Sequence, residues 1–299
     1  MEIKVTIDKT DHRLDSYLAG KLPQYSRAYL QKLIGDGLVT LNDKPMKAAW
    51  KTIAGEQIRL FVPDPEPTGL KAEHIPLDLV YEDDWLLVIN KPQGMVVHPA
   101  AGHRSGTLVN ALLEYCAGNL SDINGVIRPG IVHRIDKDTS GLILVVKNNQ
   151  VHAAVADKIR RHEIRRTYQA VVHGNPGSDS GTIDAPVGRD PRYRQRMAVV
   201  ANGKPSITHF QVQKRYSQAA WLQAELETGR THQIRVHLSY IGHPIIGDPL
   251  YAGGRWSYGL FGQALHAGSL DFEHPITGET IHLSCPLPPG FVNLLESLE

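Results

Sequence analysis

The sequence predicts an α+β protein in which a small domain precedes a larger one built on a largely antiparallel mixed sheet. Short β-branched runs outnumber helical stripes and do not alternate with them regularly, as they would around a parallel sheet. A stretch with four prolines, VPDPEPTGLKAEHIP, breaks the chain after about 60 residues. The 299 residues, 41% of them apolar, are enough for two cores. We therefore expect a first domain at 1–62, a linker at 63–76 and a second domain at 77–299.

The first domain, residues 1–62, should combine two helices with short strands. Leu14, Leu18 and Leu22 form one helical stripe, and Ser26 is a favourable N-cap for a second helix. The runs LVTLNDKP and EQIRLFV then predict two strands, the first entering an Asn-Asp turn. These elements alone fit either a structural cap or a binding module.

Short motifs in this domain follow the order found in the S4 RNA-binding domain, which it resembles. The matching residues are Arg13, Leu14, Asp15, Ser26, Arg27, Gly37 and Asn42. The resemblance implies a small domain that binds RNA. Its basic side chains, which would attract phosphate groups, are Arg13, Lys21, Arg27, Lys32, Lys44, Lys47 and Lys51.

The second domain, residues 77–299, should contain many strands and few helices. A hairpin is predicted with its turn at 83–84. Helices are predicted at 107–116 and 151–164, and a third in THQIRVHLSYIG with Thr231 as its N-cap. Further strands are predicted from RTYQAVVHG, SITHFQVQKRY and AWLQAELET.

A polar loop in GIVHRIDKDTSGLILVVKN places Asp136 between two apolar runs that predict buried strands. A carboxylate there can act as a nucleophile, a base or an electrostatic stabiliser, or can simply bond its own backbone as a turn residue. To stay ionised in a core it needs a cation. Arg230, at a strand end in ETGRTHQIR, offers one, because arginine keeps its charge and pairs bidentately with carboxylates.

Several other kinds of site do not fit the sequence. The run DKDTSG from Asp136 resembles the start of a calcium loop, but its twelfth position is Lys147 instead of a bidentate glutamate. There is no phosphate loop ending in Gly-Lys-Ser/Thr and no Gly-x-Ser-x-Gly elbow. None of the fifteen histidines makes a recognised ligand spacing. Structural or RNA-contacting roles are therefore expected for the histidines rather than a metal site.

Charge and composition favour a cytoplasmic protein with one basic zone. The net charge is +1, but residues 157–196 carry nine Lys or Arg against five Asp or Glu, which gives +4. Such a zone can hold a phosphate backbone, or it can be an ordinary solvated face. No apolar run approaches the roughly 18 residues of a membrane span, and the start lacks a secretory pattern. Cys116 and Cys285 do not suggest a disulfide framework.

The loop around Asp136 is also similar to a known motif. HRIDKDTSGLILVVKN resembles the active-site motif of the RluA-type pseudouridine synthases, with Ile135 at a position where leucine is usual. Other stretches match the family in order: INKPQGMVVHP at 89–99, RRTYQAVVHG at 165–174, LETGRTHQIRVHL at 226–238, then GHPIIGDPLYAGG and LHAGSLDFEHP. The resemblance covers essentially the whole chain and is nearest to the RluD-type branch, which modifies large-subunit ribosomal RNA.

The resemblance implies an isomerase that breaks the C1′–N1 bond of a uridine, turns the base and joins C1′ to C5, without a metal or cofactor. Asp136 would be the catalytic carboxylate, either attacking the sugar or the base or assisting an elimination. Arg230 would pair with Asp136. Tyr168 would stack on the uracil or take the C5 proton, although a strand aromatic can equally belong to the core. Ile234 would pack beneath the base.

The resemblance also implies contacts with RNA, which is the expected partner of a monomeric protein. Arg134 would fill the space left by a flipped-out uridine or hold a phosphate. In RDPRYRQRM, Arg192 and Arg194 combine with a tyrosine, a mixture that grips phosphate and stacks on bases. Lys91 is counted with these substrate-binding residues and would support the site through the Gly-rich turn that follows it.

Two alternatives stand beside the enzyme. A catalytically silent RNA-binding or ribosome-assembly protein would share the scaffold, but the intact set of Asp136, Arg230 and Tyr168 favours catalysis. A glycoside or nucleoside hydrolase would use Asp136 and Asp138. Two carboxylates in one loop rarely take the opposed positions that such hydrolysis needs.

Overall fold

The computed structural model describes most of the chain. It covers residues 2–23, 25, 27–63, 70–99, 103–117, 120–121, 129–193, 195–255 and 257–299. Ser26, Arg194 and positions 64–69 of the expected linker lie outside the described residues.

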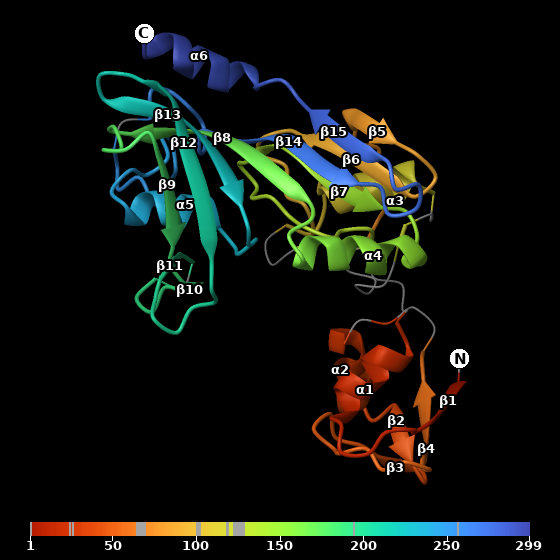
Figure 1. Ribbon diagram of the computed structural model, residues 1–299. Helices are drawn as coiled ribbons and strands as arrows, with labels where there is room; N and C mark the ends of the chain where they lie inside the picture. The colour runs from red at the N-terminus through yellow and green to blue at the C-terminus, as the bar shows by residue number, and fades with distance from the viewer. Residues whose placement is uncertain are drawn as a thin grey trace.

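The N-terminal part is one small sheet with two helices packed against it (Figure 1). Its elements are β1 (Glu2–Thr6), α1 (Leu14–Lys21), α2 (Arg27–Gly35), β2 (Val39–Leu41), β3 (Lys44–Pro45) and β4 (Gln57–Phe61). The strands pair antiparallel in the order β1-β4-β2-β3. Leu14, Leu18 and Leu22 are buried in the core between helices and sheet, so the predicted leucine stripe is confirmed.

The larger part is built on a nine-stranded sheet. Its strands are β5 (Leu79–Glu82), β6 (Leu86–Lys91), β7 (Ser140–Val146), β8 (Arg165–His173), β9 (Ser180–Asp184), β12 (Ile207–Arg215), β13 (Ala219–Leu226), β14 (Leu265–Glu273) and β15 (Thr280–Ser284). The order is β5-β6-β7-β14-β8-β13-β12-β9, and β15 pairs with β14. Among the described strands only β7 and β14 pair parallel. The largely antiparallel mixed sheet and the β5–β6 hairpin are therefore as predicted.

Helices and one small hairpin accompany this sheet. They are α3 (Leu108–Tyr115), α4 (Asn149–Arg160), α5 (Gln233–Tyr240), α6 (Pro289–Ser297) and the pair β10 (Val187–Arg189) and β11 (Met197–Val199). Figure 1 shows α4 beside the half of the sheet with β7 and α5 beside the half with β9 and β12. Within the described ranges, no helix combines the length and the apolar character needed to cross a membrane.

The two halves of the large sheet join at one short parallel pairing. His266 and Ala267 of β14 pair with Ser140 and Gly141 of β7. Gly141 has a φ of 108°, and a Cβ there would lie 2.2 Å from the Ala267 carbonyl oxygen, so the close approach requires glycine. The loop that carries Asp136 runs directly into β7, and it therefore reaches the sheet at its centre.

One predicted strand is absent from the described structure. Residues 130–132 are not a strand, and Ile131 makes only an isolated bridge to Val145. The side chain of His133 explains the difference, because its Nε2 accepts the backbone N–H of Leu144 at 2.9 Å. An imidazole here takes a hydrogen bond that a neighbouring strand would otherwise provide.

The predicted helix start after Thr231 is also wrong. The helix α5 begins at Gln233, and the N-cap residue is His232, whose φ of 57° lies in the left-handed region. The Gln233 side chain accepts the backbone N–H of Arg230 at 2.9 Å and so closes the turn from β13. This turn determines which side chains of the basic motif face the cavity described below.

Candidate active site

A cavity of about 540 Å³ opens where the Asp136 loop, β8 and the turn from β13 to α5 meet. It is the natural place for a ligand, because three segments far apart in sequence contribute polar side chains to one hollow. The side chains that the sequence singled out and that line it are Arg134, Asp136, Tyr168, Arg230 and Ile234.

Asp136 is held on one side and open on the other. Its Oδ2 accepts from Arg235 Nη1 at 2.7 Å, while its Oδ1 lies 3.9 Å from His232 Nε2. The side chain is 15% exposed, in a wall of the cavity. One carboxylate oxygen is thus fixed by an ion pair, and the other has room to meet a ligand.

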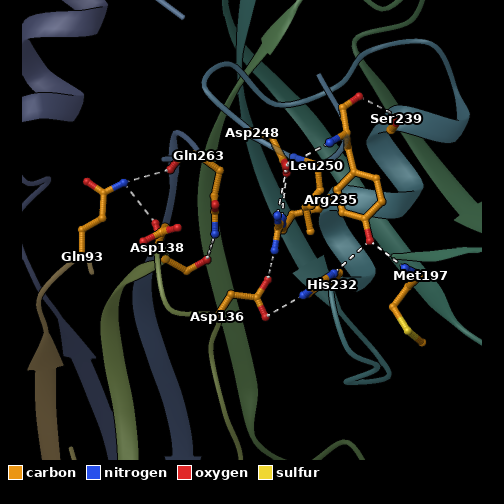
Figure 2. Close-up of polar contacts among 12 residues, drawn as sticks. Gln93, Asp136, Asp138, Met197, His232, Arg235, Ser239, Asp248, Leu250 and Gln263 are labelled. Atoms are coloured by element: carbon orange, nitrogen blue, oxygen red, sulfur yellow. Dashed lines mark hydrogen bonds and ion pairs between the residues drawn. The ribbon is translucent and has the colours of Figure 1, made fainter. Parts of the chain in front are cut away.

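Arg235 is fixed in turn by a second, buried carboxylate (Figure 2). Its Nε and Nη2 donate to the two oxygens of Asp248 at 2.7 and 3.0 Å, and the Asp248 side chain is fully buried. Asp248 also accepts the backbone N–H groups of Leu250 and Tyr251. Burial alone would lower the pKa of Arg235, but the two carboxylates outweigh it and hold the pKa above its usual value.

The predicted partner of Asp136 was Arg230, and this pairing is wrong. Arg230 lines the cavity, but its Nε donates to the carbonyl of Pro205 at 3.3 Å. Arg235 lies in the first turn of α5, where helical side chains point back toward the helix start, and this direction brings it to Asp136. The signal for Arg235 was present in the same basic motif, with Asp248 available in GDPLY to position it.

His232 is oriented by a chain of hydrogen bonds. Its Nδ1 lies 2.8 Å from the Tyr251 hydroxyl, and that oxygen accepts the Met197 backbone N–H at 2.9 Å. This contact holds the ring with its Nε2 edge toward Asp136, 3.9 Å from Oδ1. Burial lowers the pKa of His232, with the charge of Asp136 opposing it, so the ring is neutral at pH 7.

Tyr168 and Ile234 give the cavity an apolar wall next to Asp136. They are 5% and 4% exposed, and both line the hollow. Burial raises the pKa of Tyr168, and the charge of Arg166 opposes this in part. The side chain is therefore a neutral phenol at pH 7, with an aromatic face available for stacking. Arg134 is an exposed residue of the same lining.

Lys91 was predicted among the substrate-binding residues, but its buried position excludes direct contact with the substrate. The residue is fully buried, and Nζ donates to the carbonyls of Pro92, Met95 and Lys137 at 2.8, 2.9 and 3.0 Å. Burial lowers the pKa of Lys91 to about 7, while the charges of Asp138 and Asp136 act against that shift. Because it ties the turn at 92–95 to the residue after Asp136, Lys91 supports the loop from behind.

Arg192, another predicted RNA contact, lies apart from the cavity lining. Arg192 is exposed beyond β10, in the segment that joins it to β11, where the Asp190 carboxylate accepts its backbone N–H at 2.8 Å. Arg194 belongs to the same segment but is outside the described residues. Across the described part of the chain, no three His, Cys, Asp or Glu side chains are grouped so that they could hold a metal ion.

Comparisons with known proteins agree on one family. The family model described as RNA pseudouridylate synthase matches residues 85–240. The chain is 48% identical over 298 residues to the "Uncharacterized RNA pseudouridine synthase YlyB" of Bacillus subtilis (strain 168), covering 100% of this chain and 98% of that protein. It is 43% identical over 308 residues to the "Ribosomal large subunit pseudouridine synthase D" of Zymomonas mobilis, covering 99% and 97%. Its fold is similar to "Human RNA Pseudouridylate Synthase Domain Containing 4", with a TM-score of 0.59 at 24% identity over 74% of this chain and 92% of that one.

Proposed function

The chain belongs to the RNA pseudouridylate synthase family, and from that premise we propose that it isomerises particular uridines of large-subunit ribosomal RNA, with Asp136 as the catalytic carboxylate. The name of the relative from Zymomonas mobilis supports the substrate class. The main support for Asp136 as the catalytic residue is that Arg235 holds its Oδ2, while its Oδ1 makes no hydrogen bond with the described residues and can meet the substrate.

The reaction transfers uracil from N1 to C5 on the same sugar. The C1′–N1 bond breaks, the C1′–C5 bond forms, the C5 proton leaves and N1 gains a proton, so no redox equivalent is consumed. Asp136 Oδ1 attacks C1′ or the base, or assists an elimination, as a carboxylate beside an electron-poor anomeric carbon can. Arg235 keeps Asp136 ionised and oriented, and Asp248 keeps Arg235 in place.

The flipped base rests against Tyr168 and Ile234. Tyr168 either stacks on the uracil or takes the proton from C5. As a neutral phenol it can accept that proton only after its own proton has moved, so the two roles predict different effects of removing the hydroxyl. His232 positions the Asp136 side chain from the other side.

RNA around the target uridine is held by exposed cations and by the N-terminal part. Arg134 at the cavity fills the vacated stack or holds a phosphate. Arg192 and Arg194 contact the RNA backbone from the β10–β11 segment. Residues 1–62 form an S4-like RNA-binding domain, joined by a linker at 63–76 to a catalytic domain at 77–299. The protein acts as a cytoplasmic monomer.

The direct test follows the proton that leaves C5. A large-subunit ribosomal RNA transcript carrying tritium at C5 of uridine is incubated with the wild-type chain, with Asp136→Asn and with Asp138→Asn. Asp136→Asn should lower tritium release at least about 1000-fold, because the nucleophile or stabiliser is lost. Asp138 is the matched control: its side chain lies on the Gln93 side of the same loop and outside the cavity lining (Figure 2), so release should stay within about threefold.

The other outcomes have distinct meanings. Tritium release that survives in Asp136→Asn would remove this carboxylate from the chemistry. Free uracil in the supernatant would indicate a hydrolase. Tight binding by the wild-type chain without any release would favour an RNA-binding protein or a different RNA substrate, and the same assay on unmodified cellular RNA separates those two.

A further inference from the structure

A further arginine, Arg166, lines the same cavity and has no role in the mechanism above. It lies on β8 two residues before Tyr168, and side chains at this spacing share one face of a strand. Arg166 lines the cavity and is 7% exposed. Its neighbour Arg165 points to the other face, is 64% exposed, and donates to Glu225 at 2.6 and 2.9 Å.

The Arg166 guanidinium is buried without a counter-ion. Its Nε makes no hydrogen bond, and among the described residues no carboxylate or other acceptor lies within bonding distance of the group. Gly229 packs close to this side chain, because a Cβ built on Gly229 would lie 3.1 Å from Nη1. His133 does not help: burial and then the charge of Arg166 lower the pKa of His133 to about 3, so it stays neutral.

A guanidinium cannot lose its proton to escape this position, so its burial is unfavourable until an anion arrives. The acidic side chains of the cavity are already engaged. Asp136 accepts from Arg235, and Glu227 lies 2.7 Å from His209 Nε2. The anion that completes the site must therefore come with the ligand.

We propose that Arg166 binds a backbone phosphodiester of the RNA, next to the uridine that is modified. This inference rests on the proposed function. A phosphodiester carries a permanent charge and two oxygens that match the arginine fork. Two residues of a strand span about 7 Å, so a phosphate on Arg166 and a base on Tyr168 would belong to neighbouring parts of one strand. Gly229 leaves the Nη groups accessible from the cavity.

The test measures RNA affinity as a function of salt for Arg166→Gln, with Arg165→Gln as the matched control on the opposite face. The probe is the large-subunit RNA transcript. Arg166→Gln should weaken binding about tenfold and reduce the slope of log K against log salt by about 1, as expected for one lost phosphate contact. Arg166→Lys should keep the slope, because the charge remains. Arg165→Gln should leave affinity within about twofold, since that arginine already has a partner.

Thermal unfolding without RNA separates ligand binding from a structural role. An arginine that waits for a ligand destabilises the free protein, so Arg166→Gln should unfold at the same temperature as wild type or higher. A structural arginine would give a lower melting temperature instead. Gly229→Ala keeps Arg166 and adds a methyl group against Nη1, and it should weaken RNA binding at an unchanged melting temperature.

Three results would overturn the inference. An unchanged salt slope in Arg166→Gln would show that no phosphate is held there. A large loss of turnover at unchanged affinity would assign Arg166 to charge on the reacting base. A lower melting temperature with normal RNA binding would make it structural. Because the binding measurement needs no turnover, a wild-type chain that binds RNA but releases no tritium would count against the proposed function alone.

Discussion

Two carboxylates in this molecule, Asp15 and Asp136, are both paired with arginine, and they differ in how much of each is left open. Asp15 on α1 is fully buried and accepts from Arg13, Arg27, Gln31 and the backbone N–H of Ser16. Asp136 receives one arginine on one oxygen and is 15% exposed in the cavity. A closed carboxylate can only hold a fold together, whereas an open one keeps a lone pair for chemistry.

The exposure of the arginines that pair with these carboxylates shows the opposite trend. Arg13 and Arg27 are 47% and 51% exposed, so solvent screens their charge. Arg235 is 5% exposed and is committed to two carboxylates at once. The N-terminal part therefore surrounds a buried anion with exposed cations, while the cavity buries the cation and leaves one oxygen of the anion without a hydrogen bond from the described residues. This inversion distinguishes a structural ion pair from a reactive one.

The largest effect is expected when the arginine is removed from each carboxylate. Arg235→Met should lower turnover at least about 1000-fold and destabilise the fold by about 3–5 kcal/mol, because it leaves Asp248 buried and unpaired. Arg27→Met should leave turnover at saturating RNA unchanged and cost at most about 1 kcal/mol. Single-turnover kinetics and urea unfolding of the two variants measure the difference. Similar losses of turnover and stability in both variants would contradict it.

The next effect concerns Tyr168, which lines the same cavity as Asp136. Tyr168→Phe keeps the ring and removes only the hydroxyl, so turnover should fall about 100-fold at unchanged RNA affinity if that oxygen takes the C5 proton. Tyr193→Phe, on an exposed tyrosine of the β10–β11 segment, is the control. A Tyr168→Phe enzyme within threefold of wild type would leave stacking as the role of the ring.

A smaller effect, with a defined pH dependence, is expected at the closed carboxylate. Burial alone would raise the pKa of Asp15, but hydrogen bonds from Arg13, Gln31 and Arg27 hold it well below its usual value. Its stabilisation is therefore complete above about pH 4, the unfolded value, and is lost as the pH falls below that. Asp15→Asn should destabilise the N-terminal part by about 2 kcal/mol at pH 7 and by much less at pH 2.

Hydrogen exchange of the full chain, resolved by peptide, measures this change separately in residues 2–63 and in the large sheet. Protection of β7 and β8 should stay unchanged in Asp15→Asn, because that sheet shares no core residues with the small one. Equal loss of protection at pH 7 and pH 2 would mean that Asp15 is not ionised in the fold.

The smallest effect is expected at a cation that serves neither carboxylate. Arg192→Gln should weaken RNA binding about threefold and reduce the salt slope by about 1, without changing turnover at saturating RNA. Arg215→Gln is the control, since that arginine already pairs with Asp179 at 2.8 Å. An Arg192 variant with wild-type salt dependence would remove the β10–β11 segment from the RNA interface.

Local sequence pattern was sufficient for the strands at 165–173, 207–215 and 219–226 and for the loop that carries Asp136, because alternation and β-branched runs reflect burial directly. It was insufficient for the arginine that meets Asp136. Arg230 and Arg235 belong to one short motif and both line the cavity, but Arg235, which follows the left-handed His232, is the one that pairs with Asp136. Few residues other than glycine adopt that conformation, so periodicity gives no sign of it.

Two other differences have the same origin in single side chains. The run at 130–132 has strand-like residues, but the ring of His133 takes the backbone bond that a strand would have made. Lysine is a common phosphate ligand, but the ammonium group of Lys91 donates hydrogen bonds to three backbone carbonyls instead. Contacts that depend on one rotamer are decided by tertiary structure and not by the local pattern.

The late position of β14 in the chain has a consequence for synthesis of the protein. Until residues 265–273 have been made, β7 and β8 each lack a neighbour, and the large sheet exists as two halves with open edges. Open edges invite pairing with other chains, so a growing or truncated polypeptide that lacks β14 is exposed to aggregation. Asp136 and Arg235, 99 residues apart, belong to different halves. Pairing of β14 with β7 and β8 therefore joins the half that carries Asp136 to the half that carries Arg235.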